Sequence, residues 1–347
     1  MKIQKLKYII LAFGTVFLTS CTELLYTSLD VLRPAKVTFD ANANNLLIVN
    51  NTVPQPKNSG HTIVSLNQKA KNISVETDSI PLFCLGALTE QLESNGFFST
   101  VQIAPNSFNS SNNFANINTL SGDSVKKLCN IHHADVILSL DKIKVSDDIS
   151  EYFSNETSLY LAAFEVRYES NWSIHYPNKT EVTPLLFKDT IYWESESYIR
   201  DDALNDLPKR LDGIIDGALN VGKKSLQKLL PYWDKVDRNF YNSKNKFIKR
   251  GIDSVYVKNW KSAIESWQNA LNSNNTRTKF QAANNIAVAY EITGDIDKAI
   301  EYAAIAYNTY SGSYLFDYQT FNSLSEYLKE LYNRKKDISI LKKQLGE

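Results

Sequence analysis

Residues 164–176 read Phe-Glu-Val-Arg-Tyr-Glu-Ser-Asn-Trp-Ser-Ile-His-Tyr, and this stretch decides the fold of the 347-residue chain. Its even positions are mainly aromatic or aliphatic, and its odd positions are polar. Successive side chains of a strand point to opposite faces, so this alternation predicts a half-buried β-strand. Residues 177–179, Pro-Asn-Lys, predict a turn, and residues 185–194 predict an antiparallel partner strand.

Upstream of this hairpin, short apolar segments alternate with helical patterns. Strands are predicted at residues 46–49, 97–104 and 134–140. A helix is predicted from Ser79, a capping residue, to Gly96, a glycine stop, and a second helix begins near Ser121. Strands alternating with helices predict a parallel α/β core. We therefore expect a mixed sheet over residues 46–200, with helices on one face and antiparallel strands extending its edge.

Residues 201–243 are predicted to connect this domain to the rest of the chain. Leucine and other small or apolar residues recur there at three- and four-residue spacing, which predicts a long amphipathic helix. Pro208 places the start of its regular part near Leu207, and Pro231 ends it. We expect this helix to close the sheet domain and pass the chain on.

Residues 244–347 are helical and repeat. Apolar, small and aromatic residues followed by a Gly turn and spaced alanines resemble a tetratricopeptide repeat, and a similar pattern occurs 36 residues earlier. An unrelated pair of helical hairpins is the alternative. Capping helices are expected at residues 314–332 and 335–345. The fold class predicted is α+β, a mixed α/β domain followed by an all-α repeat domain. The residues expected to pack the repeats are Gly251, Ala263, Trp267, Ala270, Ala287, Tyr290, Gly294, Ala299 and Ala306.

One face of each first repeat helix is predicted to line a groove that binds a protein partner, because such a face suits an extended peptide or a helix. The alternative is that this face packs against the protein's own helix at residues 207–230 and binds nothing. The groove residues predicted are Asn245, Ile248, Ile252, Val255, Gln281, Asn284, Val288 and Glu291.

The amino terminus predicts lipidation. Three lysines precede an apolar run at residues 8–17, which is too short to span a bilayer, and Leu18-Thr19-Ser20-Cys21 reads as a lipobox. An ordinary secretory peptide with an incidental cysteine is the alternative. We expect a signal peptide at residues 1–20, acylation of Cys21, and a tether at residues 21–45. Thr22 is not an inner-membrane retention signal, so we expect the outer membrane, facing the periplasm.

Composition excludes several classes of function. The 38 basic and 38 acidic residues balance, which predicts no nucleic-acid partner. His132 and His133 lack a third histidine nearby, so no metal site is expected. No catalytic constellation or phosphate-binding Gly loop is found, and we expect a non-catalytic protein without a cofactor. Cys84 and Cys129 lie in helical patterns, which favours free thiols over a disulfide.

These features together resemble an uncharacterised family of Bacteroidota lipoproteins, described as a domain of unknown function (DUF6340-like) with C-terminal tetratricopeptide repeats. The resemblance rests on the lipobox, Arg33-Pro34-Ala35 before a short buried strand, and the repeats, and it implies no known activity. The order of elements in the sheet domain is also similar to TolB amino-terminal domains and curli-secretion lipoproteins. Two functions are expected to compete. One is a scaffold or adaptor with a protein partner, and the other is an envelope enzyme or glycan-binding lipoprotein that uses the aromatic-rich sheet.

Overall fold

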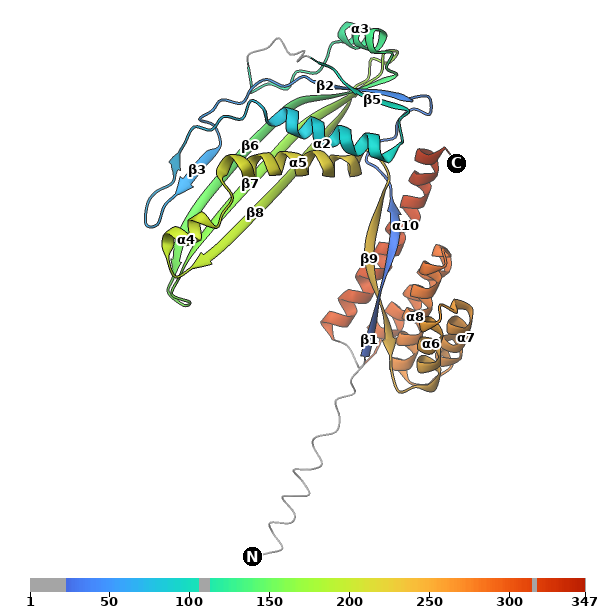
Figure 1. Ribbon diagram of the computed structural model, residues 1–347. Coiled ribbons are helices and arrows are strands. Elements are labelled where there is room, and N and C mark those ends of the chain that lie inside the picture. The colour runs from blue at the N-terminus through green and yellow to red at the C-terminus, as the bar shows by residue number, and fades with distance from the viewer. Residues whose placement is uncertain (1–22, 106–112, 314–316, 347) are drawn as a thin grey trace, which may run out of the picture. The chain divides into compact units, whose positions relative to one another are not determined.

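The computed structural model describes residues 23–105, 113–313 and 317–346 (Figure 1). These residues form two compact units. The first, here called the sheet unit, covers residues 35–230, and the second, the helical unit, combines residues 23–34 with residues 231–346. The sheet comes first and the packed helices follow, so the predicted α+β fold class is confirmed. Cys21 and the rest of the predicted lipobox lie outside the described residues.

The described part of the sheet unit contains one seven-stranded mixed sheet. Central strand β2 pairs in parallel with β5 and with the beginning of β6, which confirms the predicted parallel core. Strand β7 pairs antiparallel with both β6 and β8 along almost its whole length. The strands are β2 (Asn45–Asn50), β3 (His61–Val64), β4 (Lys71–Asn72), β5 (Thr100–Ile103), β6 (Val136–Ser154), β7 (Leu159–His175) and β8 (Thr183–Ser197).

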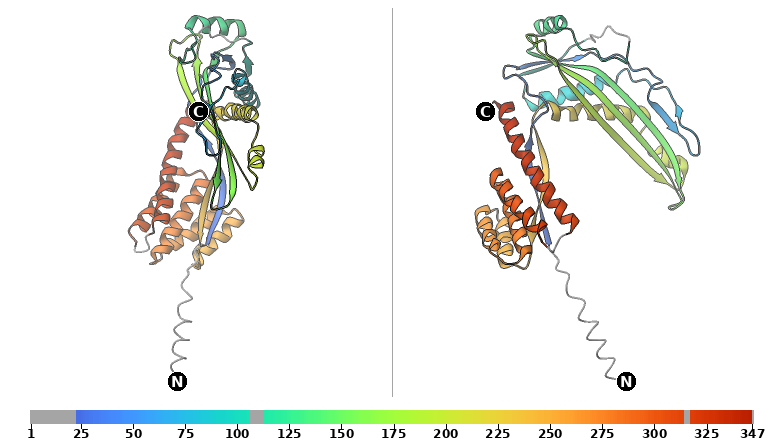
Figure 2. Two further views of the ribbon diagram at one scale, coloured as in Figure 1. Left: turned by 90° about the vertical axis from the view of Figure 1, so that its left-hand side faces the viewer. Right: turned by 180° about the vertical axis from the view of Figure 1, so that it is seen from behind.

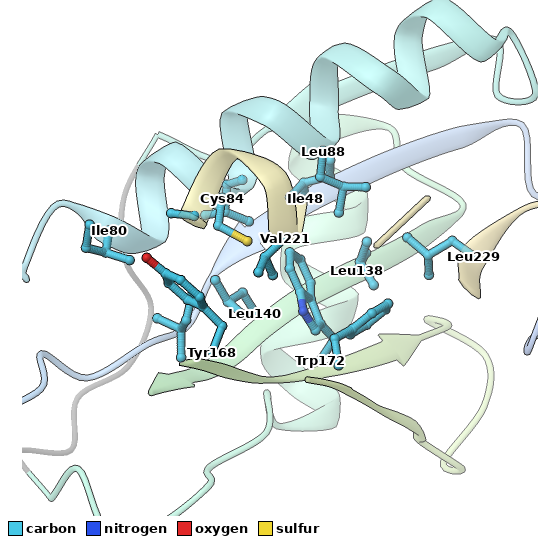
Figure 3. Packing of buried hydrophobic residues seen from close by; sticks show 14 of the residues in the cluster. Ile48, Ile80, Cys84, Leu88, Leu138, Leu140, Tyr168, Trp172, Val221 and Leu229 are labelled. Carbon is cyan, nitrogen blue, oxygen red and sulfur yellow. The ribbon is translucent and has the colours of Figure 1, made fainter. Parts of the chain in front are cut away.

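The alternation of residues 164–176 reflects the two faces of the sheet, because successive side chains of β7 point to opposite faces. The even residues Phe164, Tyr168 and Trp172 are buried in the main core under helices α2 (Ile80–Asn95) and α5 (Arg210–Leu229) (Figure 3). Helix α3 (Gly122–His132) covers the opposite face at the β2–β5 end, where its residues pack on Leu47 and Val49. The expectation that helices cover only one face was therefore wrong.

Helix α5 packs into the core of the sheet unit, as expected for a helix that closes this domain. It packs closely on α2, because Gly222 allows the two backbones to approach. The predicted helix over residues 201–230 is divided into α4 (Arg200–Asn205) and α5, and the break includes Pro208. Proline removes a helical hydrogen bond, which accounts for the interruption.

The described residues of the helical unit form five helices that stack in chain order, each packed on the next (Figure 2). Residues 318–345 form one long helix where two capping helices were predicted, and residues 314–316 lie outside the described residues. None of the helices within the described ranges is long and apolar enough to cross a membrane. The helices are α6 (Lys246–Tyr256), α7 (Trp260–Leu271), α8 (Thr276–Ile292), α9 (Ile296–Ser311) and α10 (Tyr318–Leu345).

A two-stranded antiparallel ribbon belongs to the helical unit, and sequence reasoning missed it. Strand β1 (Glu23–Arg33) pairs with β9 (Tyr232–Asn242) from Glu23–Asn242 to Arg33–Tyr232. The predicted tether at residues 21–45 is thus replaced by an ordered strand from residue 23. Side chains of β1 alternate between exposed and less exposed from Leu24 to Asp30, as expected for a strand with one face against helices.

Candidate functional site

The residues predicted to pack the repeats lie between neighbouring helices of the helical unit. A Cβ atom at Gly251 would lie 2.1 Å from Nε1 of Trp267, so only glycine fits there. The Trp267 Nε1–H donates to the carbonyl oxygen of Ile248 at 3.1 Å. Tyr290 stacks on Tyr302, and Gly294 turns the chain with a φ of 87°. The predicted alanines are all buried, namely Ala263, Ala270, Ala287, Ala299 and Ala306.

Side chains on the inner face of α8 bind the main chain of strand β9. The Asn285 amide makes two hydrogen bonds to the Tyr241 backbone, accepting from its N–H at 2.7 Å and donating to its carbonyl at 2.8 Å. One residue earlier, Asn284 donates to the Asn239 carbonyl at 3.2 Å. These contacts satisfy backbone groups of β9 that the ribbon itself does not pair. We call Asn284 and Asn285 the amide ladder.

A buried ion cluster extends the contact between α8 and β9. Glu291 accepts two hydrogen bonds from Arg238 of β9, at 2.7 and 2.9 Å, and one from Arg334 of α10 at 2.5 Å. The Tyr327 hydroxyl donates to the same carboxylate at 2.9 Å. Burial alone would raise the pKa of Glu291, but the hydrogen bonds and charge of Arg238, with those of Arg334, bring this pKa below its ordinary value.

The predicted groove is therefore not an open surface along most of its length. Asn245 caps α6, and Val255 is partly buried. The occupant is β9, not the helix at residues 207–230. The polar residues were expected to face solvent, but they serve the backbone and charges of the protein's own ribbon. The predicted groove residues that are buried are Ile248, Ile252, Gln281, Asn284, Val288 and Glu291.

Gln281 continues the amide ladder at the point where β9 leaves it. It lies one helical turn before Asn285, on the same face of α8. Strand β9 runs antiparallel to α8, since Arg238 meets Glu291 while Tyr241 meets Asn285, and it ends at Asn242. Gln281 is 1% exposed, and its Nε2 has no hydrogen-bond partner among the described residues. Gln281 is thus a third amide side chain on this face of α8, and the ribbon makes no hydrogen bond to its Nε2.

A pocket of about 430 Å³ opens beside Gln281, within the helical unit. This volume is in the range of small-ligand and peptide side-chain sites, roughly 300–1,000 Å³. It lies between the start of the ribbon, the first turns of α8 and the first turns of α10. Its lining residues are Leu24, Tyr26, Asn239, Tyr241, Arg277, Phe280, Gln281, Tyr310, Asp317, Gln319, Thr320 and Ser323.

Aromatic rings and balanced charge characterise the pocket. Phe280 packs edge-on against Tyr241 and Tyr310, at ring-centroid distances of 5.4 and 4.8 Å. Asp317 caps α10 by accepting from the Thr320 N–H at 2.8 Å, and this bond is the main cause of its lowered pKa. Burial raises the pKa of Tyr241 to about 12, so its hydroxyl stays neutral. With one arginine and one aspartate, the lining favours a neutral, partly apolar ligand over a phosphate.

The polar groups of the sheet unit form closed networks instead. Ser139 Oγ lies 2.9 Å from an Asp141 oxygen and 3.1 Å from His175 Nε2, and all three side chains are buried. In a hydrolytic triad the histidine lies between the serine and the carboxylate, whereas here Ser139 lies between Asp141 and His175. Asp147 likewise binds His61 and Arg210 deep in the fold. These networks hold strands and helices together and offer no accessible nucleophile.

The histidine and the two cysteines considered from the sequence lie in surroundings that explain them structurally. His133 ends α3 in a left-handed conformation, with a φ of 52°. The polar face of β7 carries ordinary cross-strand charge pairs, since Glu169 lies 2.8 Å from Lys188 of β8. Cys84 and Cys129 are buried free thiols, as predicted, and burial raises the pKa of Cys84 to about 12 and that of Cys129 to about 11. Sequence reasoning missed Asn285, although the adjacent pair Asn284-Asn285 inside a helix was a visible signal.

Comparison with known proteins gives two family matches. The family described as a domain of unknown function (DUF8603) matches residues 43–241, more than half of the chain. A second, described as a domain of unknown function (DUF6340), matches residues 249–333, and this confirms that part of the predicted resemblance. No curated protein matches the chain.

Two solved structures are distantly similar. One is described as a proposed homologue of neuraminyllactose-binding hemagglutinin from Helicobacter pylori, with 12% identity and a TM-score of 0.26 over 56% of this chain and 90% of that chain. The other is described as an uncharacterized protein, with 9% identity and a TM-score of 0.20 over 52% of this chain and 87% of that one.

Proposed function

Because the chain belongs to the family described as a domain of unknown function (DUF8603), for which the match supplies no activity, we propose a function from the site itself. The protein is a non-catalytic, protein-binding scaffold of the cell envelope. Its α6–α7 and α8–α9 pairs act as tetratricopeptide-like repeats, and the pocket beside Gln281 receives an extended segment of a protein partner. Lipid on Cys21 holds it to the outer membrane, facing the periplasm.

The observation that carries this proposal is Gln281, the amide side chain next to the amide ladder whose Nε2 the ribbon does not bind. Asn284 and Asn285 bind the main chain of an extended strand, and Gln281 offers the same amide chemistry one turn further along α8. A buried donor without a partner costs roughly 1–3 kcal/mol. Because Nε2 of Gln281 is itself closed off from solvent, a carbonyl group of a bound peptide removes that cost once the Gln281 side chain turns toward the pocket. The pocket beside it provides room, and its aromatic rings suit an apolar side chain of the same peptide.

The lining also argues against a catalytic role for this pocket. None of its described residues is a histidine or cysteine, and its carboxylate, Asp317, already accepts hydrogen bonds from Tyr310 and the α10 backbone. The glycan-binding alternative required an exposed aromatic face on the sheet. Phe164, Tyr168 and Trp172 are at most 3% exposed, because helices cover their face. That alternative therefore has to use the opposite face, where Tyr152 and Tyr192 are 50% and 51% exposed.

Lipid attachment is supported by the sequence of residues 1–21 alone. Cys21→Ala should leave the precursor uncut and without lipid, which mass spectrometry of the protein from isolated membranes will show. A Cys21→Ala chain of mature mass that still fractionates with the outer membrane would refute the anchor and leave the pocket proposal standing.

Site-specific photo-crosslinking in cells tests the pocket. A photoreactive residue at Gln319, which is exposed and lines the pocket, should crosslink one discrete partner. The same residue at Val257, which is 74% exposed in the α6–α7 turn, is the matched control and should not. Equal crosslinking of the same protein from both positions, or none from Gln319, contradicts a partner site at this pocket.

A further inference from the structure

Almost no chain separates the predicted lipid from the folded protein. Strand β1 begins at Glu23, so Thr22 alone lies between Cys21 and the first residue of the ribbon. A fully extended chain spans at most about 3.6 Å per residue, which places Leu24 within roughly 11 Å of Cys21 and Tyr26 within roughly 18 Å. Whatever surface the lipid enters must therefore lie next to the start of β1.

The ribbon transmits this constraint to the helices. Eleven residue pairs join β1 to β9, and the amide ladder and Glu291 hold β9 on α8. The start of β1 is consequently fixed in the helical unit, and it is not a swinging arm. Figure 1 shows that α10 begins at the same end of the unit as β1.

Exposed apolar side chains gather at this end. Leu24 is 37% exposed, Tyr26 is 70% exposed and Tyr318, in the first turn of α10, is 72% exposed. The neighbours of Tyr318 in sequence, Asp317 and Gln319, line the same pocket as Leu24 and Tyr26. Tyrosine is enriched at membrane–water interfaces, where its ring lies among the lipids and its hydroxyl reaches water.

We propose that this end of the helical unit docks directly on the bilayer surface, with Tyr26 and Tyr318 in the headgroup region. The inference rests on the lipid anchor of the proposed function. It also refines that function, because the pocket beside Gln281 then opens next to the membrane and takes a segment of its partner that runs close to the lipid surface.

Depth-dependent quenching of a fluorophore tests the docking. The full-length lipidated protein carries Tyr318→Cys, Tyr26→Cys or, as control, Val257→Cys. Each is labelled with a polarity-sensitive dye and reconstituted in vesicles of phosphatidylethanolamine and phosphatidylglycerol. Cys84 and Cys129 should stay unlabelled, because burial raises their pKa to about 12 and about 11. Headgroup-labelled quencher lipids should reduce the emission at residues 26 and 318 at least twofold more than at residue 257.

The outcomes separate the two claims. Protein that floats with the vesicles but is quenched equally at residues 318 and 257 is anchored without docking, and this overturns the inference alone. Protein that does not float with the vesicles has no lipid anchor, and this overturns the anchor and the docking together. Selective quenching at residues 26 and 318 supports both.

Discussion

An extended strand lies against a helix in each unit, but the two contacts use different chemistry. In the sheet unit, Phe164 and Tyr168 of β7 lie against Gly213 and Gly217 of α5, where an added Cβ would come within 2.3–2.4 Å of a ring carbon. In the helical unit, amide and carboxylate groups of α8 bind the main chain of β9 and its Arg238.

The difference shows where a free site can exist. Apolar side chains pack wherever their shapes fit. The packing of α5 on β7 therefore does not leave a side chain in need of a hydrogen-bond partner. Polar contact is made group by group, and it stops where β9 ends. Gln281 is left beyond that point, beside a pocket, with a buried amide nitrogen that has no partner in the described part of the chain. The two contacts should therefore respond differently to mutation and to pH.

The largest effect is expected for Glu291→Ala. It removes the carboxylate shared by Arg238 and Arg334 and leaves two largely buried guanidinium groups uncompensated. The free energy of unfolding of the helical unit should fall by about 3–5 kcal/mol, measured by chemical denaturation. Glu326→Ala, at a side chain 71% exposed, is the control and should have little effect. A loss below about 1 kcal/mol at Glu291 would show that the cluster is not essential to this contact.

A smaller loss is expected for Asn285→Leu. The substitution leaves the Tyr241 N–H and carbonyl without their partners, which should cost about 2–3 kcal/mol of unfolding free energy. Asn308→Leu, at an exposed position of α9, is the matched control. Equal stability of the two variants would mean that the amide ladder does not hold β9.

The apolar contact of the sheet unit should respond to volume. Gly213→Ala forces the new methyl group against the Phe164 ring, and a loss of about 1–3 kcal/mol is expected in thermal or chemical unfolding. Gly86→Ala places its methyl group in open space on the solvent-facing side of helix α2, so it should stabilise by about 0.5–1 kcal/mol. Opposite signs for these two Gly→Ala variants are the expected signature, and a neutral Gly213→Ala would contradict tight packing.

The two units should lose stability in different pH ranges. Burial lowers the pKa of His175 in the sheet unit, so the unfolded chain takes up its proton first, and stability is lost as the pH falls below about 6.5. The lowered pKa of Glu291 means that its contribution is present above about pH 4.3 and is lost only at lower pH. Hydrogen exchange at a series of pH values can follow β7 and α8 separately. His175→Asn should remove the early loss in β7, and no change in that variant would refute the assignment.

The sequence predicted the elements whose pattern is apolar. Period two in residues 164–176 and the leucines of α2 are read directly, because burial of apolar side chains sets both patterns. The contact of Gly251 with Trp267, between α6 and α7, involves residues selected from the sequence for the same reason. Strand β1 was missed although it alternates, since its proximity to the predicted lipobox led to its interpretation as a tether.

The polar site was misread for a physical reason. Gln281, Asn284 and Glu291 have the spacing of a helix face, and a polar face ordinarily points to water. Here the face is buried, because a strand distant in sequence supplies the hydrogen bonds that water would otherwise make. Periodicity identifies which residues share a face, but it does not say which segment covers that face.

Partner crosslinking in a Gln281→Leu chain tests the central claim most directly. Leucine removes a buried donor that has no partner among the described residues, so the free energy of unfolding should stay unchanged or rise by up to roughly 1–3 kcal/mol. The yield of the partner crosslinked from a photoreactive residue at Gln319 should fall at least tenfold. A folded Gln281→Leu chain that crosslinks its partner at the parental yield would contradict the account. The Gln281 amide would then play no part in binding.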